Sequence, residues 1–171
     1  MYQPTQVIED RLDVLQAVIT SHPLGLLISQ GGHGLSADPV PFLLDAGRGP
    51  FGTLRAHIAR ANPLWQGQDP DHEVLVVFQG PQHYTSPSWY ATKAETHKVV
   101  PTWNYVMVQA YGRLKPIEDP NWLRQQIEDL TQSQEVHRAG PWQVSDAPRP
   151  YIDADRKSTR LNSSHSSVSR M

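Results

Sequence analysis

Residues 57–63 (HIARANP) combine side chains that could bind an anionic group directly after a predicted strand. Arg60 offers a guanidinium, His57 an imidazole and Asn62 an amide, and the Asn62-Pro63 pair predicts a bend. Guanidinium donors and backbone N–H groups at a bend suit a phosphate. An incidental arginine in a surface turn explains the same spacing, so an ordinary turn is the alternative to an anion site.

Residues 80–90 (GPQHYTSPSWY) follow the clearest predicted strand and carry two prolines, a glycine and the aromatic side chains of Tyr84, Trp89 and Tyr90. A stiff loop rich in aromatic side chains can cover a planar ligand. The alternative is a loop that packs against the core or against a second subunit.

Residues 100–105 (VPTWNY) open the longest predicted strand. Side chains alternate between the two faces of a strand, so we expect Trp103 and Tyr105 on one face and Thr102 and Asn104 on the other. A polar side chain such as Asn104 needs partners if it is buried. The edge of a flavin ring supplies both donors and acceptors, whereas a half-exposed strand would leave Asn104 in water.

Other kinds of site find little support. No two of the eight histidines have the spacing of metal ligands on one helix, and no HExxH pattern occurs, so we expect no metal site. The run from Gly31 to Gly34 precedes a strand, which excludes a dinucleotide fingerprint or a P-loop. Ser86 and Ser88 lack a GxSxG setting, which disfavours a hydrolase. The chain has no cysteine, which excludes disulfides and thiolate chemistry.

The composition narrows the class of protein. The 171 residues are typical of one domain, and 15 prolines predict short strands and many turns. The net charge is −2, so the basic excess that is usual in nucleic-acid binders is missing. The N-terminus does not resemble a signal peptide and no apolar run is long enough to span a bilayer, so we expect a cytoplasmic protein without a membrane partner.

The elements that must position these residues are predicted from periodicity. Apolar residues at helical spacing predict a helix that begins near Thr5, with Thr5 as its cap, and ends before Pro23. Strands are predicted at residues 24–29, 39–44, 51–57, 73–79 and 102–114, with a bend or short helix at 59–64. Asp119 and Pro120 predict the start of a second helix. Strands this close in sequence favour an antiparallel sheet that closes into a small barrel, flanked by helices.

Residues 156–171 (RKSTRLNSSHSSVSRM) differ from the rest of the chain. They are rich in serine and basic, and they show no periodicity. A disordered tail is one interpretation, and a non-native segment of the kind found at the ends of metagenomic gene models is the other. We therefore expect one folded domain over residues 1–155 and a tail over residues 156–171.

Three ordered motifs, HIARANPLW, VVFQGPQHYTSPSWY and VPTWNYVMVQAYG, resemble the PaiB family of FMN-binding negative transcriptional regulators. The opening MYQPTQV and the stretch from Trp142 to Tyr151 are also similar. The resemblance covers residues 1–154. It implies a homodimeric split β-barrel like that of pyridoxamine-phosphate oxidase, with FMN at the subunit interface.

The resemblance also implies positions for the cofactor. Pro41 and Phe42 would lie beside the isoalloxazine ring. The bend at residues 57–62 would hold the phosphate and ribityl chain. The long strand and the loop before it would contribute further residues, either to the site of the same subunit or to that of the second subunit. The implied FMN-binding residues are Pro41, Phe42, His57, Ile58, Ala59, Arg60, Asn62, Trp89, Trp103 and Asn104.

Four functions remain open. The family name favours a regulator that acts on promoter DNA, and the fold equally allows a flavin-dependent oxidoreductase, since FMN supplies the chemistry. Some split barrels bind or degrade haem, which would require a ligand such as His57 or His83. A structural dimer with an empty pocket is the fourth. Members of the family continue past Tyr151 with another strand and a basic segment, so we expect a C-terminally truncated barrel with an unpaired edge.

Overall fold

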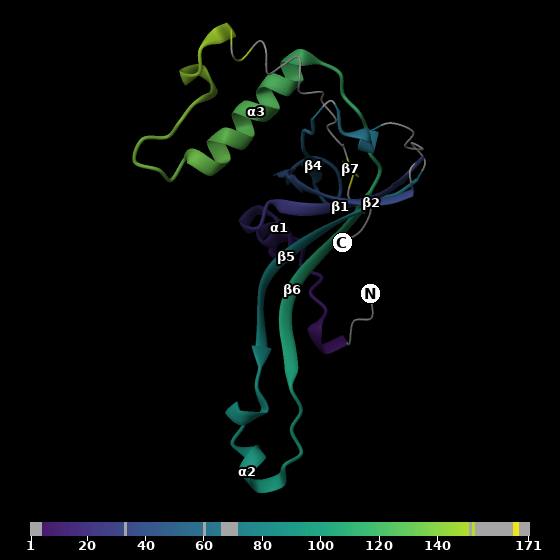
Figure 1. Ribbon diagram of the computed structural model, residues 1–171, viewed down its shortest axis with the longest axis vertical. Coiled ribbons are helices and arrows are strands. Elements are labelled where there is room, and N and C mark those ends of the chain that lie inside the picture. The colour runs from purple at the N-terminus through teal and green to yellow at the C-terminus, as the bar shows by residue number, and fades with distance from the viewer. Residues whose placement is uncertain are drawn as a thin grey trace.

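Two antiparallel sheets and their flanking helices make up the computed structural model, which describes residues 5–32, 34–59, 61–65, 72–150, 152 and 166–167 (Figure 1). One sheet has the strand order β2-β1-β5-β6 and the other has the order β3-β4-β7. The strands are β1 (Leu24–Gly31), β2 (Gly34–Pro41), β3 (Leu43–Asp45), β4 (Thr53–Arg55), β5 (Val74–Thr85), β6 (Thr102–Gly112) and β7 (Ser166–Ser167). The predicted antiparallel, mainly β class is confirmed, whereas the described strands do not close into one barrel.

The β1–β2 hairpin turns between Gly31 and Gly34, and Gly34 has a φ of 95°, which favours glycine. The predicted return strand at residues 39–44 was misplaced. The observed strand β2 begins at Gly34 and ends at Pro41, and β3 starts at Leu43. Between them, the N–H of Phe42 donates to the carbonyl of Pro23 at 2.8 Å. Two prolines are tolerated in β2 because it is the edge strand of its sheet.

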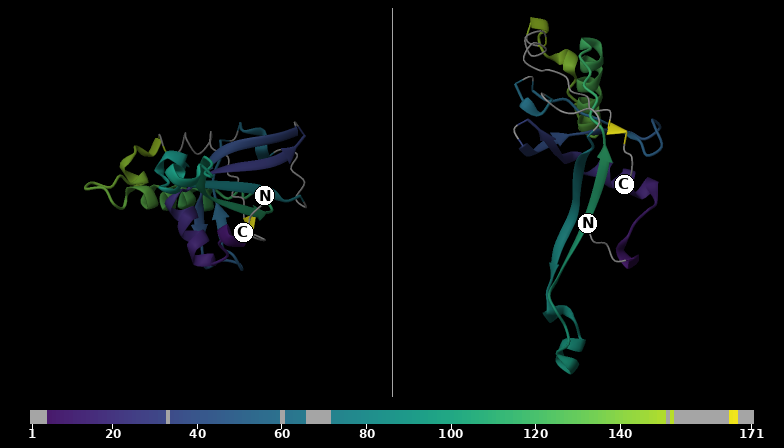
Figure 2. Two further views of the ribbon diagram at one scale, coloured as in Figure 1. Left: turned by 90° about the horizontal axis from the view of Figure 1, so that it is seen from below. Right: turned by 90° about the vertical axis from the view of Figure 1, so that its right-hand side faces the viewer.

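Strands β5 and β6 form a long two-stranded arm, which we define as residues 79–107. Figures 1 and 2 show it projecting away from the other strands, with the short helix α2 (Thr92–Thr96) at its tip. Residues 80–85 were predicted as a loop, and this was wrong. A β-bulge between Gln79 and Gln82 accommodates Gly80 and Pro81, and the strand then continues to Thr85. The 3-10 turn η3 (Pro87–Trp89) follows.

The helices begin where side chains cap them or where the chain bends. Helix α1 (Leu12–Ser21) starts later than predicted, because Thr5 lies in a separate 3-10 turn, η1 (Thr5–Val7), and Arg11 occupies the N-cap. Helix α3 (Pro120–Glu135) begins as predicted, and Asp119 Oδ1 accepts a hydrogen bond from Asn121 N at 2.9 Å. Two further 3-10 turns are η2 (Pro63–Trp65) and η4 (Val144–Asp146).

The core lies between one face of the four-stranded sheet, α1 and the β3–β4 pair. Its buried members include Ile19, Leu27, Val40, Phe42, Leu54, Val76, Phe78 and Val108. Phe42 and Phe78 meet edge to face, with ring centroids 5.6 Å apart. Gly25 permits this packing, because a Cβ there would stand 2.7 Å from Val76 Cγ1 and 2.8 Å from Phe78 Cε1.

Strand β7 pairs with β4, matching Ser166 with Leu54 and Ser167 with Thr53. These two serines belong to the segment that the sequence separates from the domain. The domain boundary near residue 155, the truncation and the non-native origin of residues 156–171 all stay predictions. Among the described helices, none is both long enough and apolar enough to cross a membrane.

Candidate functional site

The four-stranded sheet exposes an apolar face on the side opposite the core. Residues paired across β2, β1 and β5 lie side by side on this face. One such row is Pro39, Leu26 and Val77, and the next is Ala37, Ile28 and Leu75. We call this the outer face, and its members are Leu24, Leu26, Ile28, Leu35, Ala37, Pro39, Pro41, Leu75, Val77 and Met107. Leu35 is 73% exposed and Leu24 is 64% exposed. Exposed apolar area of this extent is typical of an interaction surface.

The outer face continues along the arm as a group of aromatic and amide side chains. The strand pairs Gln82–Tyr105 and Tyr84–Trp103 place these four residues on one side, and we call them the aromatic wall. Trp103 Nε1 donates to Gln82 Oε1 at 3.0 Å, and the rings of Tyr84 and Trp103 lie 5.9 Å apart. Trp103 and Tyr105 are 56% and 55% exposed, so this face can stack against a planar partner.

A hollow of about 210 Å³ lies at the base of the aromatic wall, beside the β-bulge. It is lined by Gln79, Gly80, Gln82, Trp103, Tyr105, Val106 and Met107. Pockets for small molecules usually span about 300–1,000 Å³. The hollow of one copy is thus smaller than a usual small-molecule pocket.

Asn104 and Trp89 do not join the aromatic wall. Asn104 pairs with His83 on the opposite side of the arm and donates from Nδ2 to Thr85 Oγ1 at 3.2 Å. Trp89 stacks on His83, with ring centroids 5.5 Å apart and planes 17° apart. Of the predicted arm residues, Trp103 thus faces one side and Asn104 the other, as the alternation of a strand requires.

The predicted anion site follows β4, and its residues divide between core and surface. Ile58 is 8% exposed and belongs to the core, His57 is half-buried and Ala59 is exposed. Arg60, the central residue of the prediction, lies outside the described residues. Asn62 shapes the bend, since its Oδ1 accepts from Leu64 N at 2.8 Å and its Nδ2 donates to Asp38 at 3.3 Å. This amide thus stabilises η2 against β2.

The two predicted neighbours of the ring, Pro41 and Phe42, face opposite sides. Pro41 is exposed on the outer face, beside Leu24. Phe42 is 1% exposed and its ring packs in the core. Pro41 can therefore contact a ligand on the outer face, whereas Phe42 supports that face from below.

Sequence reasoning missed two groups of residues. Gln82 and Tyr105 complete the aromatic wall, and only the register of a strand that continues past Pro81 would have shown this. Arg55 was also missed, although its Nη2 lies 2.9 Å from Asp129 Oδ2 on α3. Its signal would have been the alternation along β4, which sets Arg55 on the side opposite Leu54 and Ala56.

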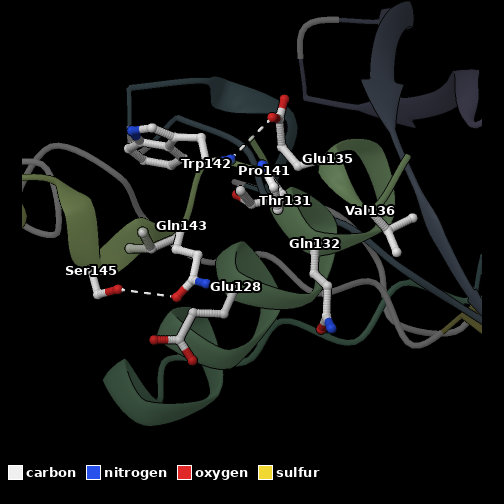
Figure 3. Close-up of a pocket in the computed structure, with 10 residues that line it drawn as sticks. Glu128, Thr131, Gln132, Glu135, Val136, Pro141, Trp142, Gln143 and Ser145 are labelled. Atoms are coloured by element: carbon white, nitrogen blue, oxygen red, sulfur yellow. Dashed lines mark hydrogen bonds between the residues drawn. The ribbon is translucent and has the colours of Figure 1, made fainter. Parts of the chain in front are cut away.

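A larger cavity of about 510 Å³ opens between α3 and the segment that follows it (Figure 3). Trp142 N donates to Glu135 Oε2 at 3.2 Å and so attaches this segment to the helix. No sequence pattern predicts this cavity, because residues 140–151 show no helical or strand periodicity. In the described part of the chain, no three histidine, aspartate or glutamate side chains gather in a way that could hold a metal ion.

The chain is similar in sequence to a known protein family and to several known proteins. Residues 1–160 match the model of a family described as "Putative FMN-binding domain". An uncharacterized protein of Emericella nidulans is 36% identical over 192 residues, which cover 92% of this chain and 76% of the relative. The "Protease synthase and sporulation protein PAI 2" of Bacillus subtilis is 36% identical over 88 residues, or 52% of this chain and 40% of that protein.

A solved structure shares the fold. It is titled a "putative 5-nitroimidazole antibiotic resistance protein" from Bacteroides thetaiotaomicron, and it superposes with a TM-score of 0.61 over 93% of this chain and 81% of that chain. The two sequences are 13% identical, so the likeness concerns the fold alone.

Proposed function

Because the chain belongs to the FMN-binding domain family of the PaiB type, we propose that it binds FMN in a site that two copies of the chain share. The aromatic wall carries this proposal. It presents two exposed rings beside a hollow that also contains the side-chain amides of Gln79 and Gln82. An isoalloxazine ring needs such apolar stacking area together with a few donors and acceptors at its edge.

The chemistry of the described residues fits a flavin if each copy contributes one part. Pro41 and the outer face supply apolar contact, while the bend after β4 supplies His57 and, in sequence, Arg60. The arm, on which the aromatic wall lies, projects away from the other strands (Figure 1). A second copy whose arm reaches toward the first would bring the wall and the bend together, and the bound flavin would then supply redox chemistry.

The exposed outer face supports the homodimer. Two sheets that pack through their apolar faces bury side chains such as Leu24, Leu26 and Leu35, which are 64%, 38% and 73% exposed in one copy. In this arrangement the two sheets of each chain would form the halves of a split barrel, as the family resemblance implies. We expect this dimer to be cytoplasmic.

For the biological role we propose negative transcriptional regulation with FMN as the sensed group. The support is the family resemblance together with the similarity to the "Protease synthase and sporulation protein PAI 2" of Bacillus subtilis. The net charge of −2 argues mildly against direct contact with DNA, so binding to promoter DNA would depend on a local basic patch.

The test is the absorbance spectrum of purified protein after FMN is added and excess is removed. Retained flavin that copurifies with a dimer in sedimentation experiments is the expected result. Arg60→Ala should weaken FMN binding by roughly a few kcal/mol, on the order of a charge-assisted pair. Unchanged affinity in that variant would refute the phosphate assignment, and a Soret band in place of flavin absorbance would favour haem.

A second pair of assays separates the two flavin roles. A mobility shift of promoter DNA that weakens as salt rises would support the regulator. Turnover of a reduced nicotinamide with an electron acceptor, without any DNA shift, would favour an oxidoreductase instead. The variant with both Leu24→Glu and Leu26→Glu should be monomeric and lose flavin, which tests the shared site.

A further inference from the structure

The cavity beside α3 is separate from the outer face and from the bend after β4. Its volume of about 510 Å³ lies within the usual range for small-molecule sites. The lining residues are Glu128, Thr131, Gln132, Glu135, Val136, Pro141, Trp142, Gln143, Val144 and Ser145. Figure 3 shows Trp142 and Gln143 on one side and Glu128 below them on the helix.

Hydrogen bonds hold the wall of the cavity in place. Glu135 Oε2 accepts from Trp142 N at 3.2 Å. Gln143 N donates to Asp146 Oδ2 at 2.9 Å, and Asp146 N donates back to the Gln143 carbonyl at 2.9 Å, which closes η4. A wall that is already ordered loses little conformational freedom when a ligand binds.

The lining is acidic. It contains Glu128 and Glu135 and no lysine, arginine or histidine. Arg124 and Arg138 pair with these carboxylates from outside the lining, at 2.8 Å and 3.0 Å. An ionised carboxylate can accept several hydrogen bonds, so each retains capacity toward the cavity.

The end of α3 contributes a further partial negative charge beside these two carboxylates. The helix ends at Glu135 beside the cavity, and its last turn contains no basic residue. The C-terminal end of a helix carries a partial negative charge that favours cations.

Trp142 provides the apolar part of the site. Its side chain is 48% exposed, and an indole face attracts cations as well as apolar groups. We propose that this cavity binds a small organic cation, an ammonium or guanidinium group carried on an apolar body.

The experiment uses two probes of nearly equal shape and opposite charge, phenethylammonium and 3-phenylpropanoate, titrated calorimetrically into the full chain. We expect phenethylammonium to bind with one-to-one stoichiometry and 3-phenylpropanoate not to bind. Glu128→Gln and Trp142→Leu should each weaken the ammonium probe about tenfold. Glu95→Gln, which removes an acid from α2 on the arm, should leave its affinity unchanged.

Binding of neither probe, or equal binding of both, would overturn the proposal. Wild-type affinity in both Glu128→Gln and Trp142→Leu would also overturn it, because the probe would then bind elsewhere. Circular dichroism of both variants checks that α3 remains folded. The titration contains no flavin, so its outcome is independent of the FMN proposal.

Discussion

Arg55 on β4 and Asp129 on α3 are 74 residues apart in sequence and form an ion pair, with Nη2 2.9 Å from Oδ2. Their side chains are only 20% and 29% exposed. Gln125 Nε2 donates to the other carboxylate oxygen at 2.8 Å. The pair therefore fixes α3, and with it the acidic cavity, to the strand that leads into the predicted anion site.

Asp129→Asn should lower the free energy of unfolding by about 1–2 kcal/mol, between the values for exposed and for fully buried ion pairs. Urea unfolding of Asp129→Asn, Arg55→Gln and the double variant measures the coupling. The matched control is Glu128→Gln, which breaks a more exposed pair on the same helix and should cost less. Additive effects of the two single variants would show that the ion pair contributes nothing.

Gln126→Leu should stabilise the protein. Gln126 is 0% exposed, and neither of its side-chain polar atoms has a hydrogen-bond partner in the described structure. A buried unpaired polar group costs about 1–3 kcal/mol, and leucine has a similar size without that cost. Thermal unfolding checks this, with Gln134→Leu on the exposed side of α3 as the control. A lower melting temperature for Gln126→Leu would mean that the amide has a partner.

Gly25→Ala should destabilise the fold by about 1–3 kcal/mol, the usual cost of overpacking. The new Cβ would lie 2.7 Å from Val76 Cγ1 in the centre of the core. Gly140→Ala is the control, because a Cβ there meets nothing within 4 Å. Equal urea midpoints for the two variants would contradict the close packing around β1.

Glu9 should titrate well below an ordinary glutamate. The side-chain hydrogen bonds from Arg11, one of them 2.6 Å long, lower the pKa of Glu9 from 4.5 to about 2. Because the pKa of Glu9 is lower in the folded state, its ionised carboxylate stabilises the fold at pH values above the unfolded pKa of 4.5. This stabilisation is lost as the pH falls from 4.5 toward 2. NMR titration of the Glu9 carboxyl measures the pKa, and Arg11→Gln should return it to the ordinary value. A wild-type pKa near 4.5 would refute the pair.

Trp103→Ala should weaken FMN binding by about 1–2 kcal/mol, the loss expected for one stacked aromatic ring. Flavin fluorescence titration measures the dissociation constant. Trp142→Ala removes another exposed indole, far from the aromatic wall in sequence, and should not change FMN affinity. Equal effects of the two variants would place the flavin away from the arm.

Much of the fold follows from local sequence patterns. Continuous apolar runs predicted β1, the first half of β5 and β6, and Asp119-Pro120 predicted the start of α3. Proline accounts for two errors in the strands. The predicted start at Pro39 was wrong, because β2 begins at Gly34 and includes both Pro39 and Pro41. Pro81 was likewise read as ending a strand, although an edge position or a bulge accommodates proline within a sheet.

The candidate site was less predictable than the fold. Alternation along β6 correctly separated Trp103 from Asn104, because the period of a strand is a local property. The burial of Phe42, the hydrogen bond from Trp103 to Gln82 and the ion pair between Arg55 and Asp129 depend on residues distant in sequence. Periodicity contains no information about such contacts.

The β-bulge at Gly80 and Pro81 also keeps the aromatic wall on one side of the arm. It inserts one extra residue into β5 opposite β6, and beyond it Gln82 and Tyr84 share a side with Tyr105 and Trp103. Deleting one of the two bulge residues would restore an uninterrupted ladder that keeps the same pairs, Gln82 with Tyr105 and Tyr84 with Trp103. A one-codon deletion at the bulge would thus leave the aromatic wall assembled, whereas a one-residue slip of β5 against β6 beyond the bulge would turn Gln82 and Tyr84 to the other side.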